Sequence, residues 1–323
     1  MRTHQLLILF LIVGLSSVIR SFAQTPNLGN HFDYDKNAPL DIKTIGSEKR
    51  GDVTVYDITY ASPKGGVVPA YLVVPKGKGP FAAIVWGHWY WTNSPMFNRK
   101  QFLDEAVALA PAGVVSLLTD GPNARPGYVP DRTPLNDKQI TDRIQAVIDM
   151  RRGIDLLLAR KDVDPKRLAF VGHSYNAATG AFLSGIDRRA KAYVLMAGAL
   201  SDELDMKTPE FEAFRQRIGP EKVDAFVAKY PWMDQGKYLA QAAPAFVFMQ
   251  FATQEDFLKP PHVLQYDRVV SKPNMLKVYE APHSLNAAAT RDRIQFLTEQ
   301  LKLKKLSPEV ISAIPELYQP PRP

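Results

Sequence analysis

The sequence predicts an α/β fold in which helices flank both faces of a mostly parallel central sheet. Short, continuous apolar runs typical of buried parallel strands alternate along the chain with longer segments of helical periodicity. The chain has 323 residues, of which 46% are hydrophobic, and this is enough for one large domain with a sizeable core. We therefore expect a single α/β domain over residues 24–323.

The first residues are typical of an export signal. Arg2 gives a positive start, an apolar run covers residues 6–18, and Ser21 and Ala23 supply small side chains at a cleavage site. We expect residues 1–23 to be a signal peptide cleaved after Ala23, which gives a periplasmic or secreted protein. A membrane anchor is the alternative, but the apolar run is shorter than the ~20 residues that span a bilayer. No membrane association is expected after cleavage.

Composition excludes several classes of site. The chain contains no cysteine, so it has neither a thiolate metal ligand nor a cysteine nucleophile, and it forms no disulfides. Its formal net charge is +7, but the basic residues are scattered along the chain. Nucleic-acid binding surfaces gather such residues into a stripe or patch. We therefore expect no nucleic-acid partner.

The N-terminal half begins with an antiparallel hairpin. Residues 52–60 and 67–74 alternate in hydrophobicity, and Lys64, Gly65 and Gly66 supply the turn between them. Residues 81–86 form a continuous apolar run, as expected for a buried strand. Asn98 and Gln101 are spaced as a capping box for the helix that follows.

The remaining elements follow the same alternation. A loop rich in proline, glycine and asparagine covers residues 121–135, and a long helix follows over 140–158. Residues 201–243 are charged and mixed, which indicates a small helical cap inserted above the sheet, and residues 308–323 form a proline-rich tail. Further strands are expected over 114–118, 168–171, 192–196, 246–251 and 275–279, and a final helix over 294–301.

One strand leads into a serine flanked by small residues. The run 168–171 ends in Gly172, His173 and Ser174, and a helix-like segment of small residues follows. This is the pattern of a nucleophile elbow, in which a strained strand-to-helix turn exposes the serine hydroxyl above the sheet. Asn176 stands where a second glycine is usual, and asparagine tolerates positive φ better than most residues.

A serine hydroxyl becomes a good nucleophile when a histidine base, oriented by a carboxylate, takes its proton. His283 lies between the last predicted strand and the last helix, at the carboxyl end of the sheet. Glu255 directly follows the strand over 246–251, and the adjacent Asp256 is the alternative acid. Less suitable acids are Asp202 and Glu203, and less suitable histidines are His4, His31, His88, His173 and His262.

The oxyanion formed on a carbonyl substrate needs two backbone N–H donors. The N–H group of Tyr175, directly after the serine, is expected to be one of them. Trp89, in the loop after the strand over 81–86, is the expected second donor, with Tyr90 as the alternative. The same loop is unusually aromatic, and His88, Tyr90 and Trp91 are expected to line a substrate pocket. Packing beneath the loop is the other interpretation.

Together these residues resemble the α/β-hydrolase superfamily, in particular its dienelactone-hydrolase-like and acyl-esterase branch. The resemblance extends from about residue 53 to 303 and includes the elbow, residues 101–106, residues 191–198 and residues 283–286. It implies carboxylic-ester hydrolysis through an acyl-enzyme, without metal or cofactor. Ser174 would be the nucleophile, His283 the base and Glu255 the acid, in the chain order that this fold uses.

The leading hypothesis is thus an exported serine hydrolase that acts on a small-molecule carboxylic ester. A prolyl-oligopeptidase-like peptidase is the second hypothesis, because such catalytic domains share the fold and the residue order. The third is a noncatalytic binding protein on a hydrolase scaffold, since a fold does not fix a function.

Overall fold

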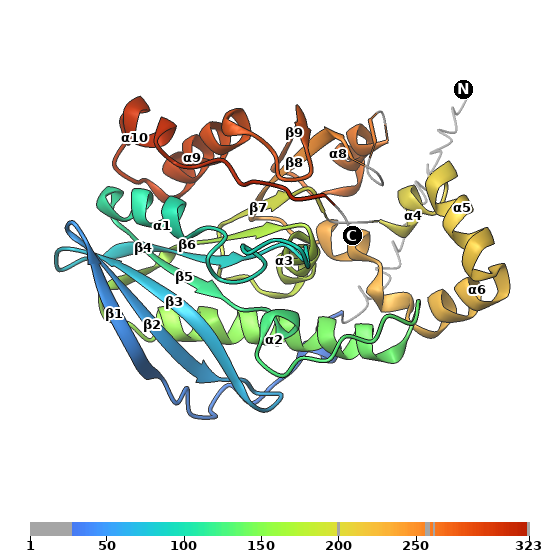
Figure 1. Ribbon diagram of the computed structural model, residues 1–323, viewed down its shortest axis with the longest axis horizontal. Helices are drawn as coiled ribbons and strands as arrows, with labels where there is room; N and C mark the ends of the chain where they lie inside the picture. The colour runs from blue at the N-terminus through green and yellow to red at the C-terminus, as the bar shows by residue number, and fades with distance from the viewer. Residues whose placement is uncertain (1–27, 199–200, 256–258, 261, 322–323) are drawn as a thin grey trace, which may run out of the picture.

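The computed structural model describes residues 28–198, 201–255, 259–260 and 262–321. A nine-stranded sheet forms its centre, in the strand order β1-β2-β3-β5-β4-β6-β7-β8-β9 (Figure 1). The first three strands, β1 (Lys43–Arg50), β2 (Val53–Ala61) and β3 (Val67–Pro75), pair antiparallel, and β3 also runs antiparallel to β5 (Val114–Thr119).

The other strands run parallel to one another from β5 to β9. They are β4 (Phe81–Gly87), β6 (Val163–His173), β7 (Ala192–Met196), β8 (Phe246–Gln254) and β9 (Asn274–Pro282). Since parallel strands need long crossovers, helices connect them and cover both faces of the sheet. The carboxyl ends of β4, β6, β8 and β9 therefore meet at one edge.

The core has two layers, one on each face of the sheet (Figure 1). One layer packs the sheet against α2 (Asp137–Leu158) and α3 (Tyr175–Ile186). The other packs it against α1 (Leu103–Leu109) and α9 (Ala287–Leu301). Because both faces are covered, β4 and β5 are buried along their whole length, which explains their continuous apolar sequences.

The segment between β7 and β8 is helical. It contains α4 (Asp202–Asp205), α5 (Pro209–Ile218), α6 (Pro220–Lys229) and α7 (Gln235–Leu239), and α5 and α6 lie on the side of the molecule opposite β1 (Figure 1). The shorter elements are η1 (Asn30–Phe32), η2 (Ala110–Ala112), η3 (Pro122–Ala124), η4 (Pro231–Met233), η5 (Val263–Gln265), α8 (Tyr266–Val269) and α10 (Pro308–Ser312).

The mostly parallel sheet with flanking helices confirms the predicted fold class, and two details differ from the prediction. The edge strand β1 was not predicted; it is almost entirely exposed and lacks the alternation of a half-buried strand. The predicted capping box is wrong, because α1 begins at Leu103 and the Gln101 side chain bonds elsewhere.

The predicted signal peptide, residues 1–23, lies outside the described residues. Within the described ranges, no helix is both long and apolar enough to span a bilayer.

Candidate active site

Ser174 occupies a sharp turn between β6 and α3. Its backbone has φ 52° and ψ −109°, and this positive φ is strained for a residue with a side chain. The turn is held because the Ser174 N–H donates to the carbonyl of Met196 at 2.7 Å. A Cβ atom at Gly198 would lie 2.5 Å from the Ser174 carbonyl, and one at Gly172 would collide with the backbone of Asn176. Small residues are therefore required around the serine.

Asn176 fits into this turn without a positive φ angle, because it already belongs to α3. Its side chain is completely buried and donates from Nδ2 to the carbonyl of His88 at 2.6 Å. The neighbouring strand β4 leaves room for this side chain because it ends in a glycine. A Cβ at Gly87, the last residue of β4, would lie 2.5 Å from the Asn176 Cβ. A glycine on β4 thus compensates for the glycine missing from the elbow.

Glu255 and His283 meet at the carboxyl edge of the sheet. Glu255 follows β8 and His283 follows β9, and the His283 Nδ1–H donates to Glu255 Oε1 at 2.7 Å. Both side chains are buried, with 2% of the glutamate side chain and 11% of the histidine side chain exposed. A carboxylate only accepts hydrogen bonds, so this contact places the proton on Nδ1 and leaves Nε2 as the basic nitrogen. The alternative acid Asp256 and the side chains of Asp202 and Glu203 lie outside the described residues.

A chain of hydrogen bonds connects the loop after β4 to the backbone of His283. The Trp89 N–H donates to Gln101 Oε1 at 2.7 Å, so the other end of that amide, Nε2, is the donor to His173 Nδ1 at 2.6 Å. His173 must then carry its proton on Nε2, which donates to the carbonyl of His283 at 2.8 Å. Burial, reinforced by the nearby His283, holds the pKa of His173 well below its ordinary value, which keeps the ring neutral as this chain requires.

The oxyanion donors expected from the sequence differ in their availability. Tyr175 is the first residue of α3, where a backbone N–H has no acceptor within the helix. The Trp89 N–H, by contrast, is bonded to Gln101, which differs from the prediction that it faces the substrate. For the alternative, Tyr90, no acceptor of the backbone N–H occurs in the part of the chain that the structure describes.

The aromatic loop after β4 packs around the histidines. The Trp89 ring stacks on His173 and on Trp91, with centroid distances of 5.2 and 5.3 Å, and the Trp91 ring lies 5.4 Å from His283. His88, Trp89 and Trp91 are all buried, whereas Tyr90 is 39% exposed. The sequence predicts that His88, Tyr90 and Trp91 line a substrate pocket. In the structure only Tyr90 has a large exposed surface.

His88 links two loops instead. Its Nε2 accepts from the Gly121 N–H at 2.9 Å, and its Nδ1–H therefore donates to the carbonyl of Trp89 at 2.6 Å. Burial lowers the pKa of His88, and a neutral ring is the form that both bonds need. The loop after β4 is thus fixed to the loop after β5.

Gln101 and His173 are the site residues that sequence reasoning missed. The sequence pattern places Gln101 in a helix cap, and it marks His173 only as the middle residue of the elbow motif. Each acts on residues far along the chain, at separations of 72 residues between them and 110 residues from His173 to His283. No local spacing rule could have found these pairs.

Comparisons with known proteins rest on structure. Neither a protein-family model nor a curated protein matches the sequence. Among solved structures, an acetyl xylan esterase from Paenibacillus sp. R4 is similar with a TM-score of 0.65 and 19% identity, over 81% of this chain and 90% of that one. Acetyl xylan esterase 1 from Thermoanaerobacterium sp. JW/SL YS485 has a TM-score of 0.68 and 18% identity, over 84% and 92% of the two chains.

A glucuronoyl esterase from Solibacter usitatus is also similar, with a TM-score of 0.59 and 14% identity over 81% of this chain and 86% of that chain. At such identities the likeness concerns the path of the backbone. It agrees with the strand order and the elbow described above. The chain therefore has the α/β-hydrolase fold.

Proposed function

We propose that this protein is a serine-dependent carboxylic ester hydrolase that works through an acyl-enzyme. The hydrogen bond of 2.7 Å between His283 Nδ1 and Glu255 Oε1 carries the proposal, since it prepares a histidine base at the same sheet edge as the strained turn of Ser174. The esterase neighbours support the same reaction class.

In the proposed mechanism, His283 Nε2 takes the proton of the Ser174 hydroxyl as its oxygen attacks the ester carbonyl. Glu255 keeps the Nδ1–H in place and stabilises the imidazolium that forms. The Tyr175 N–H stabilises the oxyanion, and the Tyr90 N–H is the better second donor because that of Trp89 is bonded to Gln101. His283 then protonates the leaving alcohol, and a water molecule activated by the same histidine releases the acid.

Small esters of carbohydrates are the substrate class that we propose to test first. Two of the similar structures are acetyl xylan esterases and a third is a glucuronoyl esterase. The exposed Tyr90 ring, packed at 4.8 Å on Phe97, offers an aromatic face of the kind on which a sugar ring can lie.

Labelling with a fluorophosphonate probe tests the mechanism. Purified wild-type protein should be labelled, and both Ser174→Ala and His283→Ala should abolish the labelling and the hydrolysis of acetylated sugars while thermal melting shows a folded protein. Folded wild-type protein that neither reacts with the probe nor cleaves esters would contradict the proposal and favour a noncatalytic binding role.

We also propose that the protein is exported and cleaved after Ala23. The positive start at Arg2, the apolar run over residues 6–18 and the small residues Ser21 and Ala23 support this. N-terminal sequencing of protein recovered from the periplasm or the medium should begin at Gln24. A product that keeps residues 1–23 would rule out the cleavage.

A further inference from the structure

We propose that Gln319 is a positioning residue for His283, and that residues 314–321, here called the C-terminal strap, hold the two loops of the active site together. The inference rests on the proposed function, because it assigns a role in the same reaction. It starts from the path of the chain: after α10 the strap passes across the sheet edge towards α3 (Figure 1).

Three consecutive strap residues bond to the two loops. Gln319 Oε1 accepts from the Ser284 N–H at 2.9 Å, next to His283 in the loop after β9. The carbonyl of Pro320 accepts from the indole Nε1–H of Trp91 at 3.0 Å, and that of Pro321 accepts from Asn93 Nδ2 at 3.2 Å. Trp91 and Asn93 belong to the loop after β4, more than 200 residues away along the chain. The strap thus joins that loop to the loop after β9, here called the histidine loop.

The Gln319 bond completes the support of one peptide group. The peptide between His283 and Ser284 accepts at its carbonyl from His173 and donates at its N–H to Gln319. Rotation of this peptide would change the backbone angle ψ of His283 and move the imidazole relative to Ser174. Both polar groups of this peptide are thus hydrogen-bonded, the carbonyl to His173 of β6 and the N–H to Gln319 of the strap.

The loop needs such support because its next turn is strained. Leu285 has φ 64°, an uncommon conformation for a branched side chain, and its N–H closes the turn on the carbonyl of Pro282 at 2.9 Å. A strained residue persists when surrounding contacts over-determine its conformation. The Gln319 bond, one residue earlier, is one of these contacts.

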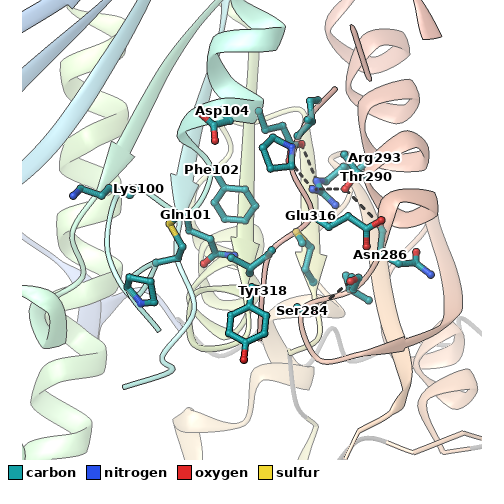
Figure 2. A pocket seen from close by; sticks show the side chains of 18 residues that line it. Lys100, Gln101, Phe102, Asp104, Ser284, Asn286, Thr290, Arg293, Glu316 and Tyr318 are labelled. Atoms are coloured by element: carbon teal, nitrogen blue, oxygen red, sulfur yellow. Dashed lines mark hydrogen bonds and ion pairs between the residues drawn. The ribbon is translucent and has the colours of Figure 1, made fainter. Parts of the chain in front are cut away.

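The strap is bonded at its far end but packed loosely along its middle. A cavity of about 190 Å³ lies beneath it, between strap residues such as Leu317 and Tyr318 and the side chains of Phe102, Met196 and Arg293 (Figure 2). Glu316 and Tyr318 are exposed. Since the middle of the strap covers little of the core, loss of the Gln319 bond should disturb the histidine loop more than the global stability.

The test compares Gln319→Leu, which removes the acceptor, with Gln319→Glu, which keeps an acceptor oxygen at the same reach. Glu316→Gln is the matched control, because it changes an exposed strap residue for which no hydrogen bond within the described residues is seen. We expect Gln319→Leu to lower kcat about tenfold with KM and the melting temperature nearly unchanged. Gln319→Glu should retain most of the activity, and Glu316→Gln should match wild type.

A second readout does not depend on turnover. The proton on His283 Nδ1, shared with Glu255, should give a downfield NMR signal, and Gln319→Leu should shift or broaden it while Glu316→Gln leaves it in place. Wild-type protein that hydrolyses esters while Gln319→Leu is equally active and keeps the signal would overturn the positioning role alone. Wild-type protein that neither hydrolyses esters nor reacts with fluorophosphonate would overturn the proposed function and, with it, the role of Gln319.

Discussion

His173 Nε2–H donates a hydrogen bond of 2.8 Å to the backbone carbonyl of His283, so the residue directly before the proposed nucleophile supports the proposed base. The two rings stack at a centroid distance of 5.2 Å. Movement of the elbow would therefore be transmitted to the histidine loop, and the relative placement of Ser174 and His283 is fixed through one buried side chain.

Replacement of His173 by phenylalanine tests this coupling. The aromatic ring can still stack on Trp89, but the carbonyl of His283 and Nε2 of Gln101 lose their partner. We expect kcat/KM to fall by about tenfold to a hundredfold, because the base is held less accurately. Two buried polar groups left unpaired should lower the free energy of unfolding by roughly 2–4 kcal/mol.

Kinetics with an aryl acetate and urea denaturation measure these two effects. His31→Phe is a suitable control, since His31 stacks on Trp232 at 4.0 Å, away from the catalytic loops. If His173→Phe retained wild-type kcat/KM, the hydrogen bond from His173 to the carbonyl of His283 would be unnecessary for the reaction.

The two buried neutral histidines predict a pH dependence of stability. Burial lowers the pKa of both His88 and His173 in the folded state, whereas an unfolded histidine titrates near ~6.5. Below that pH the unfolded chain binds protons that the folded chain does not. The free energy of unfolding should therefore fall as the pH decreases through ~6.5, by at most about 1.4 kcal/mol per pH unit for each histidine, and neither should contribute a slope above ~7.5.

Urea denaturation between pH 5 and 8 checks this slope. His88→Gln keeps a donor for the carbonyl of Trp89 and an acceptor for the N–H of Gly121, but it cannot be protonated. The slope of the variant below pH 6.5 should be smaller than that of wild type, by at most about 1.4 kcal/mol per pH unit. Equal slopes would mean that His88 takes up protons in the folded protein as readily as in the unfolded chain.

Glu255→Gln tests the assignment of the acid. The amide can still contact His283 Nδ1 but offers no negative charge, and it can favour the wrong tautomer of the ring. We expect kcat to fall by about a thousandfold or more. Asp256→Asn is the matched comparison, because it alters the neighbouring carboxylate in the same way and should leave kcat near wild type. The reverse result in stopped assays at saturating substrate would transfer the role of the acid to Asp256.

The sequence was sufficient for features that depend on local pattern. Buried strands such as β4 and β5 are continuous apolar runs because both of their faces are covered, and the elbow is visible as a strand, Gly172, Ser174 and a small-residue helix. The edge strand β1 was missed because it buries almost nothing, so no hydrophobic pattern marks it.

What could not be predicted depends on contacts between distant segments. Gln101 has the spacing of a capping residue, yet its amide bridges Trp89 and His173. Gln319 lies in a proline-rich tail that resembles a loose end, and it reaches Ser284. In both cases the residue type permits several hydrogen bonds, and the topology of the sheet decides which of them forms.

Gly87 and Asn176 form a pair whose sizes should be coupled. Gly87→Ala would place a Cβ 2.5 Å from the Asn176 Cβ, so the loop after β4 or the elbow must move. We expect this variant to lose about 1–3 kcal/mol of stability and most of its esterase activity. Asn176→Gly removes the obstructing side chain but also its bond of 2.6 Å to the carbonyl of His88, and it should lose about 1–2 kcal/mol by itself.

The double variant Gly87→Ala/Asn176→Gly distinguishes a steric pair from two independent effects. If the two side chains compete for one space, the double variant should be more stable than the sum of the single losses predicts, by at least about 1 kcal/mol. Urea denaturation of all four proteins measures the coupling, and fluorophosphonate labelling reports whether the elbow is productive again. Strictly additive losses would show that Gly87 does not provide the space for Asn176, and the tolerance of asparagine in this elbow would need another cause.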